Sequence, residues 1–523
     1  MTATTEIIVR PDRNVVPREL NGSSQEKKEE TTKLRQAMPQ VCAVGAKNLL
    51  LLTFGSTLGF PTILIPALNE KNSDISATRS DLAWISSINL FAVPFGCLFS
   101  GPISTYLGRK RTMQLSMIPF ISAWLLFYYS TTPEMLFLAL SLTGLTGGLV
   151  EAPILTYVAE VTQPHLRGML SATSTMAVIL GIFSQFLTGK FITNWRVICL
   201  VNLIYPVLCF TALSLVPESP YWLTGKGRIQ EAERALCWLR GWVSPSHIRE
   251  ELQSICNIVQ NDNVHGVKLK SWEEYKKRTF IMPFILVILS FFISAFGGSA
   301  TLQTYSVQIF DEMKAPLDKY TATVFLGLAE LIGTAVCVTA IHFTGKRIIN
   351  FASIIGTGIC FFSSALYLYL IRHNLLDAHN YTWIPTTFLI GSAFLSHMGI
   401  RLLAWILAGE VFPVKVRAFA TGAAASIGYI FTSIVNKSFL DMSSGLGLSG
   451  TFLFYAGVNL FGLIILYFLL PETEGRTLQE IEEHYAGIQN LKYKPKNDKL
   501  SIKEKWAASN QAISTDIDAE SKL

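Results

Sequence analysis

Twelve long apolar segments, separated mostly by short polar connections, constrain this chain more than any other feature of its sequence. A helix needs about 20 mainly apolar residues to cross roughly 30 Å of hydrocarbon, and these segments are of that order of length. Half of the 523 residues are apolar and only 15% are charged, which is typical of a polytopic membrane protein and unlike a soluble enzyme. We therefore expect an all-α membrane protein with twelve transmembrane helices.

The chain also repeats itself over a long distance. The stretch Glu160-Val-Thr-Gln-Pro-His-Leu-Arg167 returns about 250 residues later as Glu410-Val-Phe-Pro-Val-Lys-Val-Arg417, with the same spacing between carboxylate and guanidinium. Two shorter motifs return at nearly that distance: Gly108-Arg109-Lys110 as Gly345-Lys346-Arg347, and Pro217-Glu218-Ser219-Pro220 as Pro471-Glu472-Thr473-Glu474. Self-similarity at a fixed long period is typical of a duplicated architecture. The repeats predict two six-helix halves.

Polar stretches divide the chain into five parts. We expect an N-terminal tail at 1–44, a first six-helix half at 45–216, a helical linker at 217–279, a second half at 280–470 and a C-terminal tail at 471–523. The linker alternates apolar and charged residues with helical spacing but is too short to bury much core alone. The tails and the linker hold most of the basic residues, so the positive-inside rule predicts that both termini are cytoplasmic.

Several classes of function lack the residues that they need. Histidine, serine and aspartate occur without catalytic motif context, and no glycine-rich phosphate loop is present, which disfavours an enzyme or an ATP-driven pump. The eight cysteines lack the paired spacing of zinc sites, so we expect no metal, no disulfide and no cofactor. The net charge of +6 is spread over tails and loops, which argues against a nucleic-acid partner.

What remains is a pore or a carrier, and two halves joined by a long loop favour the carrier. The partners that we expect are a small solute and the lipid bilayer. No feature of the sequence indicates an oligomeric state.

A set of motifs spread along the chain resembles the signatures of the sugar porter family within the major facilitator superfamily. They lie at 101–110, 160–168, 195–196, 217–223, 405–417 and 471–478. The resemblance covers about residues 45 to 485 and is similar in detail to the facilitated trehalose transporters of insects. It implies a plasma-membrane carrier that moves trehalose or a hexose by alternating access. Proton-driven members carry an aspartate where this chain has Thr57, which favours passive transport.

The resemblance also implies a network of charges at the cytoplasmic ends of the spans. Its members would be Arg109, Glu160, Arg167, Glu218, Glu410, Arg417 and Glu472. One exposed ion pair contributes only about 0.2–1 kcal/mol, but several that form together when these ends meet would bias the carrier toward its outward-facing state. The alternative interpretation is that these charges merely cap helices and set the topology.

The expected sugar site departs from the family pattern. Two glutamines and an asparagine of span seven are replaced by Ser294, Ala295 and Ala300, and the glycine of a glycine-proline pair in span ten is replaced by Arg401. We expect the site to contain residues at positions aligned with the family's binding residues, together with aromatic side chains that can stack on a sugar ring and polar side chains that can orient it. The candidates are Thr175, Gln303, Thr304, Tyr305, Glu330, Arg401, Trp405 and Tyr429. For each aromatic residue the alternative is core or lipid packing.

Four ionisable residues fall inside the expected spans: Glu151, Glu330, His397 and Arg401. Because an unpaired charge in the bilayer is costly, such residues pair, face water or mark a pathway. We hypothesise that Arg401 pairs with Glu330 or Glu151, or meets an anionic substrate; a purely structural ion pair is the alternative. Two rival functions therefore stay open, a carrier that has diverged to another polar or anionic solute and a non-transporting nutrient sensor.

Overall fold

The structure is a computed structural model that describes residues 33–70, 73–264, 275–373, 381–413, 416–476, 478–488 and 491. All regular elements within these ranges are helices. Most of the predicted tails, at 1–32 and 492–523, and linker residues 265–274 lie outside the described part of the chain.

The N-terminal half contains six spans, most of them built from two consecutive helices. They are α1 (Lys33–Gly59) with α2 (Pro61–Asn69), α3 (Arg79–Ile85) with α4 (Ile88–Leu107), α5 (Arg109–Leu115) with α6 (Met117–Tyr129), α7 (Pro133–Leu149) with α8 (Glu151–Val161), α9 (Pro164–Phe191), and α10 (Trp195–Asn202) with α11 (Ile204–Leu215). Local sequence explains these helix starts. Pro61, Pro133 and Pro164 open helices where a missing N–H costs nothing, and Thr78 forms a capping box with Asp81.

Three further helices and a second six-span half follow. They are α12 (Pro220–Gly225), α13 (Ile229–Leu239), α14 (Pro245–Val264), α16 (Arg278–Phe296) with α17 (Ser299–Glu312), α18 (Lys319–Thr344), α19 (Lys346–Arg372), α20 (Trp383–Met398) with α21 (Ile400–Glu410), α22 (Arg417–Leu469) and α23 (Leu478–Ala486). Helices α12 to α14 fall in the predicted linker. They are bonded to the first half, because Trp222 Nε1 donates to the Thr105 carbonyl at 2.9 Å and Arg240 to the Val161 carbonyl at 3.3 Å.

The prediction of twelve transmembrane helices is confirmed once two special cases are counted. Ten helical stretches of the described residues are individually long and apolar enough to span a membrane. One of them, α22, has 53 residues, and at 1.5 Å per residue a straight helix of that length would measure about 80 Å, far more than the bilayer core. It breaks at Gly447, whose φ is +74°, and so holds two spans. The pair α5–α6 supplies the remaining span.

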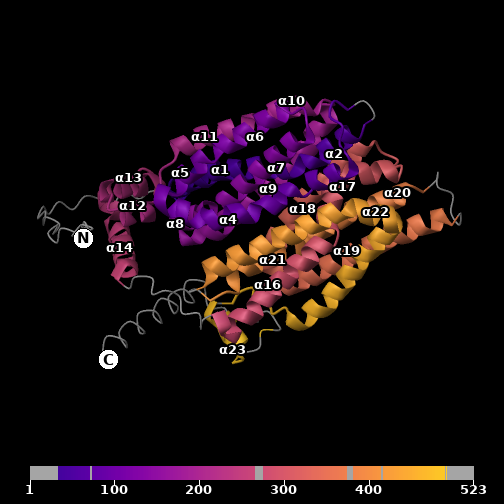
Figure 1. Ribbon diagram of the computed structural model, residues 1–523. Helices are drawn as coiled ribbons and strands as arrows, with labels where there is room; N and C mark the ends of the chain where they lie inside the picture. The colour runs from indigo at the N-terminus through magenta and orange to yellow at the C-terminus, as the bar shows by residue number, and fades with distance from the viewer. Residues whose placement is uncertain are drawn as a thin grey trace, which may run out of the picture.

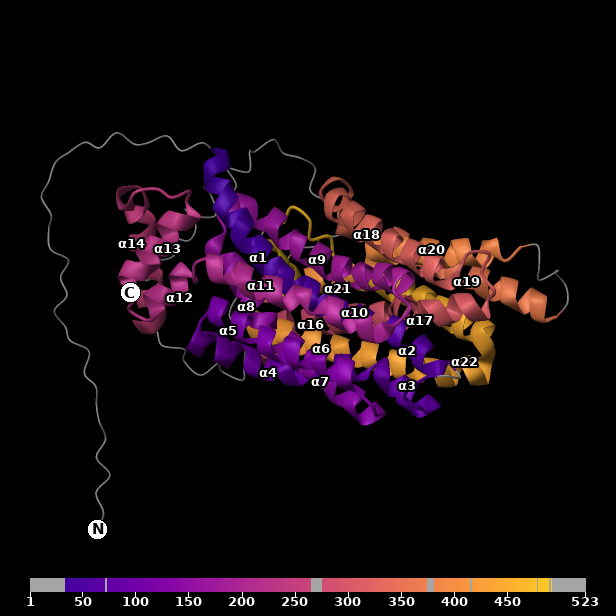
Figure 2. The same ribbon diagram turned by 90° about the horizontal axis from the view of Figure 1, so that it is seen from above.

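The two halves lie side by side along one long axis. Figure 1 shows the N-terminal half, indigo to magenta, above the orange and yellow C-terminal half, with α12 to α14 at one end. In the view from above, α2, α3, α17 and part of α22 gather toward the opposite end (Figure 2). We call the end that carries α12 to α14 the linker end, and the opposite end, where the halves are bonded together, the sealed end.

Glycines allow the closest helix contacts inside the first half. A Cβ on Gly148 of α7 would lie 2.1 Å from the Val93 carbonyl oxygen of α4, and one on Gly55 of α1 would lie 2.1 Å from the Val178 carbonyl oxygen of α9. Because lipid tails are as apolar as the helix surfaces, the hydrophobic effect does not drive helices together in a bilayer. Close van der Waals packing of their backbones stabilises the helix contacts instead. The glycines thus determine how near the helices approach.

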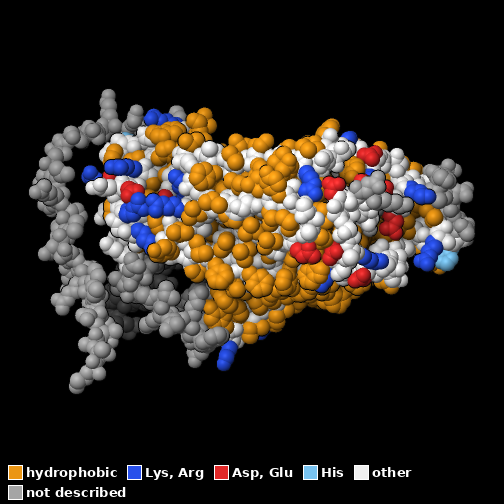
Figure 3. Space-filling view, turned by 45° about the horizontal axis from the view of Figure 1, so that its top comes forward, with side chains coloured by type: hydrophobic (Ala, Val, Ile, Leu, Met, Phe, Trp, Pro, Cys, Tyr) orange, Lys and Arg blue, Asp and Glu red, His pale blue; other side chains and the backbone are white. Residues whose placement is uncertain are grey.

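The surface fits a bilayer. Figure 3 shows a wide belt of apolar side chains in the middle of one face and charged side chains toward the two ends. Large apolar residues in the spans are strongly exposed, including Leu98 at 70% and Phe468 at 77%. An exposed apolar surface of this extent needs an apolar partner, and lipid provides it.

Candidate functional site

Hydrogen bonds join the two halves at the sealed end. Thr62 donates to the carbonyl oxygen of Gln303 at 3.0 Å. Ser433 of α22 donates to the Ser87 carbonyl at 3.0 Å, and the Asn436 amide donates to the Ser86 carbonyl at 3.2 Å. Each bond ties a helix of one half to the main chain of the other.

Charged groups reinforce the same junction. The Lys437 ammonium lies 3.5 Å from the ring centroid of Trp84, a cation–π contact between halves. The Arg79 guanidinium lies 3.8 Å from the Asp441 carboxylate and also donates to the Leu440 carbonyl. We refer to these cross-half contacts, made by Arg79, Trp84, Lys437 and Asp441, as the outer latch.

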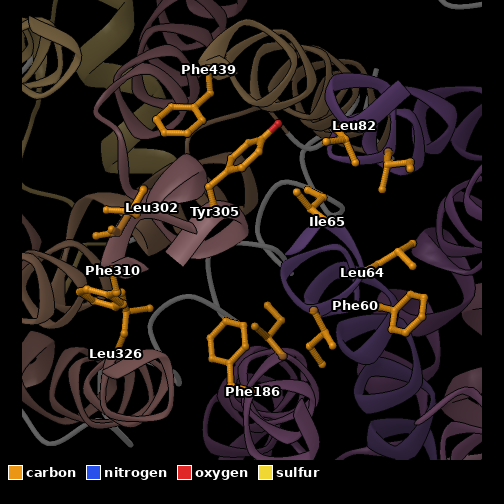
Figure 4. Close-up of a cluster of buried hydrophobic side chains, with 14 of the residues drawn as sticks. Phe60, Leu64, Ile65, Leu82, Phe186, Leu302, Tyr305, Phe310, Leu326 and Phe439 are labelled. Carbon is orange, nitrogen blue, oxygen red and sulfur yellow. The ribbon is translucent and has the colours of Figure 1, made fainter. Parts of the chain in front are cut away.

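A buried apolar cluster fills the interface beneath the outer latch. Figure 4 shows Phe60, Leu64, Ile65 and Leu82 of the first half converging with side chains of the second half. The Tyr305 ring lies 4.5 Å from that of Phe439. Water and solutes are therefore excluded from this end of the interface.

Two of the predicted site residues belong to this junction. Tyr305 is only 1% exposed, and its hydroxyl donates to the Asn436 carbonyl at 3.2 Å. Thr304 accepts a hydrogen bond from the Asn436 amide at 3.1 Å. Both bonds connect α17 with α22 inside the second half, next to the bond from Asn436 to the Ser86 carbonyl that joins the two halves.

Further along the interface, Gln303 joins two charged residues of the second half. Its amide nitrogen donates to a Glu330 carboxylate oxygen at 2.7 Å, and its amide oxygen accepts from Arg401 at 3.3 Å. Glu330 is 1% exposed, whereas Arg401 is half-buried. Within the described residues Arg401 and Glu330 make no direct ion pair, and the hypothesised pairing runs through this amide.

Aromatic rings continue the site on α21 and α22. Trp405 is 37% exposed and packs edge-on against Phe291 at 5.1 Å and Tyr429 at 5.6 Å between ring centroids. It follows Arg401 by four residues, so both side chains share one face of α21. Gln303, Glu330, Arg401, Trp405 and Tyr429 therefore form one cluster, which we call the central site.

The remaining predicted residues and span charges lie around the central site. Thr175 is half-buried on α9 of the first half, and Glu151 starts α8 within electrostatic range of Tyr429. His397 is fully buried, with its Nδ1 3.0 Å from the Ala393 carbonyl. A further charge, Lys47 of α1, is also fully buried with its ammonium 2.5 Å from the Ser174 hydroxyl. Lys47 was not among the predicted span charges, although it stands inside the first apolar segment.

A cavity of about 310 Å³ lies where α1, α9 and α18 meet. Its walls are mainly apolar and include Leu331 of the second half. Its polar groups are Asn48 and Thr173, and the Asn48 amide donates to the Thr173 hydroxyl at 2.8 Å. The two halves are therefore less tightly packed here than beneath the outer latch.

At the linker end the predicted charges of the first half form a compact network. Arg109 donates two hydrogen bonds to the Glu160 carboxylate at 3.1 and 3.2 Å, and Ser219 also donates to Glu160. Glu218 accepts from the main-chain nitrogen of Lys110 at 2.9 Å, which caps α5. Gly108 has φ +105°, and a Cβ there would lie 2.5 Å from Glu218 Oε2.

The second half repeats this arrangement. The Lys346 ammonium contacts Glu410 at 2.6 Å and Glu474 at 3.1 Å. Glu472 accepts from the main-chain nitrogen of Lys346 at 3.1 Å, and Gly345 has φ +89° with a Cβ position 2.5 Å from Glu472 Oε2. Lys346 thus takes the place of Arg109. It was not among the predicted gate residues, although the repeated motif Gly345-Lys346-Arg347 contained the signal.

The other two predicted gate arginines bind carbonyl groups. Arg167 donates to the Ala159 carbonyl at 2.9 Å, and Arg417 donates twice to the Phe412 carbonyl at 3.0 and 3.1 Å. Burial lowers the pKa of Arg417, and the carboxylates of Glu410 and Glu482 oppose this shift. In the described residues neither arginine forms an ion pair with the glutamate that precedes it. The bonds of the predicted gate residues therefore stay within one half, unlike those at the sealed end.

The chain is similar to known transporters along most of its length. The family model described as "Sugar (and other) transporter" matches residues 42–485. The chain is 28% identical over 467 residues to the facilitated trehalose transporter Tret1 of Apis mellifera ligustica, which covers 87% of this chain and 91% of that protein. It is 27% identical over 463 residues to Tret1 of Bombyx mori, covering 88% of this chain and 90% of the relative.

Solved structures show the same fold. The proton:xylose symporter XylE, of the major facilitator superfamily, bound to 6-bromo-6-deoxy-D-glucose, superimposes with a TM-score of 0.67 at 19% identity, over 86% of this chain and all of that chain. The inward open conformation of XylE from E. coli superimposes with a TM-score of 0.68, also at 19% identity, over 84% of this chain and 98% of that one. At this identity the likeness concerns the fold alone.

Proposed function

We propose, because the chain belongs to the sugar (and other) transporter family, that it carries trehalose or a hexose passively across the plasma membrane by alternating access. As a member of this family the protein is a transporter and not an enzyme. The relatives named facilitated trehalose transporters support the choice of substrate. The sequence-based orientation places the linker end, with both termini, in the cytoplasm.

The asymmetry between the two ends carries this proposal. Hydrogen bonds, the outer latch and an apolar cluster join the halves at the sealed end. At the linker end the bonds of the predicted gate residues stay inside each half. In our proposal this structure corresponds to the conformation with its site open to the cytoplasm, and rocking the halves about the site would open the other side.

In the proposed site, Trp405 offers an aromatic face for the C–H face of a sugar ring, and Arg401 offers N–H donors for hydroxyl groups. Tyr429 and the Gln303–Glu330 pair flank these two residues. Thr175 would complete the site from the first half, and Thr304 and Tyr305 would border it where the sealed end begins.

The gate charges have a related role in our proposal. Arg109, Glu160, Glu218, Glu410 and Glu472 hold the linker-end turns of each half as rigid units. Of the described gate residues, Arg167 and Arg417 are the two cations whose hydrogen bonds go to main-chain carbonyl groups. When the linker ends approach, they become available to carboxylates of the opposite half, which would stabilise closure.

Uptake into liposomes tests the proposed function. Purified protein should take up labelled trehalose or glucose saturably and equally at two values of pH. An aromatic anchor contributes about 2 kcal/mol to binding, and about 1.4 kcal/mol corresponds to a factor of ten, so Trp405→Ala should raise the apparent KM more than about tenfold. Trp383→Ala, at an exposed tryptophan at the start of α20, is the matched control. Well-folded protein without sugar flux would refute the proposal.

Breaking the outer latch should shift the carrier toward its other state. A cation–π contact contributes about 0.5–2 kcal/mol, so Lys437→Gln should raise the population that is open at the sealed end by about 2- to 30-fold. The readout is the labelling rate of Ser87→Cys by an impermeant thiol reagent added outside, in a cysteine-depleted background. Lys319→Gln is the control, since Lys319 pairs with Asp311 within the second half. Equal labelling in both variants would contradict the role of the latch.

A further inference from the structure

We propose that the central site also carries sugars that bear a carboxylate, such as hexuronates, and that each moves together with one proton bound by Glu330. This inference rests on the proposed function, since it adds a substrate class to the same site. Neutral sugars would still move without a proton.

The central site contains one cation and one carboxylate joined by one amide. Gln303 contacts Glu330 at 2.7 Å and Arg401 at 3.3 Å. In a low-dielectric interior a charge is tolerated only when an opposite charge and hydrogen bonds compensate it. With no solute bound, an ionised Glu330 balances the charge of Arg401 through Gln303, so this pair carries no net charge.

The other titratable groups near this pair are accounted for. His397, four residues before Arg401, is buried with its Nδ1 at the Ala393 carbonyl. Tyr429 of α22 lies within electrostatic range of both Arg401 and Glu151, the latter from the opposite half. Among the described residues, Glu330 is therefore the carboxylate that is linked to Arg401 by hydrogen bonds.

An anionic sugar changes this balance. Arg401 is half-buried and one helical turn from the exposed ring of Trp405, so a pyranose on Trp405 can place a carboxylate against the guanidinium. Such pairs are strong and often bidentate. The site would then hold two carboxylates and one cation. One proton from solution, bound to a Glu330 oxygen, restores neutrality.

Gln303 can serve both states because its amide carries a donor and an acceptor. When Glu330 is ionised, the amide N–H can donate to it in the arrangement that the structure has, with Gln303 Nε2 at 2.7 Å from the carboxylate. When Glu330 is protonated, a turned amide would accept the new O–H with its oxygen and offer its N–H groups to the solute carboxylate. After the halves rock, the solute leaves and the proton returns to solution on the same side. One anion and one proton have then crossed, and no net charge has moved.

Proteoliposomes provide the test. With the outer solution one pH unit more acidic than the lumen, labelled glucuronate should accumulate up to about tenfold, because one proton then supplies about 1.4 kcal/mol. Glucose uptake should be independent of the gradient. A trapped pH-sensitive dye should report acidification when glucuronate enters, and an imposed membrane potential should not change its accumulation.

Variants assign the proton to Glu330. Glu330→Gln should take up glucuronate without accumulation across the pH gradient and without acidification, whereas Glu134→Gln, at an exposed carboxylate of α7, should behave like the wild type. Arg401→Gln should lower the ratio of glucuronate to glucose uptake at least about tenfold, the factor that 1.4 kcal/mol represents.

The outcomes separate this inference from the proposed function. Wild-type protein that moves glucose but excludes glucuronate, or that moves glucuronate without a proton, overturns the inference alone. Protein that moves no sugar of either kind overturns both. The dye measurement on the wild type decides proton coupling even if Glu330→Gln fails to fold.

Discussion

Replacement of Lys346 by methionine is expected to destabilise the second half strongly. The Lys346 ammonium contacts Glu410 at 2.6 Å and Glu474 at 3.1 Å, and the lysine side chain is only 6% exposed. Its removal leaves two carboxylates close together without this cation. Breaking a buried ion pair costs about 3–5 kcal/mol, and because the Glu410 side chain is 34% exposed, we expect a loss near the lower end of that range.

Thermal unfolding of the purified protein in detergent measures this effect, and an exposed ion pair provides the matched control. Arg228 and Glu231 form an equally short pair on α13, but their side chains are 36% and 48% exposed. Exposed pairs contribute about 0–1 kcal/mol, so Arg228→Met should hardly change the melting temperature. If Lys346→Met and Arg228→Met lowered the melting temperature equally, burial would not explain the stabilisation that we assign to the Lys346 ion pairs.

Replacement of Gly148 by alanine is expected to disrupt the packing of α4 against α7. The added Cβ would lie 2.1 Å from the Val93 carbonyl oxygen and 2.8 Å from the Cys97 nitrogen. These are main-chain atoms, so rotamer changes cannot relieve the clash and the two helices must separate. Overpacking costs about 1–3 kcal/mol when side chains can adapt, and we expect a loss at or above the upper end of that range.

The control is another glycine of the same half. A Cβ on Gly168 of α9 would meet nothing within 4 Å, and alanine is favoured over glycine in a helix by about 1 kcal/mol. Gly168→Ala should therefore leave the melting temperature unchanged or raise it, whereas Gly148→Ala should lower it and reduce the yield of monodisperse protein. This account of the packing would be contradicted if Gly168→Ala lowered the melting temperature, or if Gly148→Ala left it unchanged.

The fold could be predicted almost completely because its causes are local. Each span is recognisable from its own composition, since the bilayer requires a long apolar helix. The repeated motifs indicated two similar halves, and the bonds around Glu160 and Glu410 follow them closely. The role of Lys346 could also have been predicted from the repeat, because Lys346 occupies the position in its motif that Arg109 occupies in the first half.

The candidate site was predicted less completely. The sequence predicted Arg401, Glu330, Gln303 and Trp405 as residues of one site, partly by resemblance and partly from the cost of burying charge, and hydrogen bonds join the first three in the structure. It did not indicate that Gln303 bridges the two charges, nor that Lys47 is fully buried beside Ser174. Such contacts depend on which faces of distant helices meet, and the spacing of residues along one helix carries no information about that.

The sequence by itself therefore determined the number of spans and the division into two halves, because bilayer thickness and the repeated motifs govern these features. Only the tertiary structure decided which end of the interface is sealed. That choice depends on contacts between residues about 350 positions apart, such as Asn436 with Ser86, and on the balance of two states that can differ by only a few kcal/mol. The same sequence is compatible with both states, and the outer latch of Arg79, Trp84, Lys437 and Asp441 is visible only once the halves are placed.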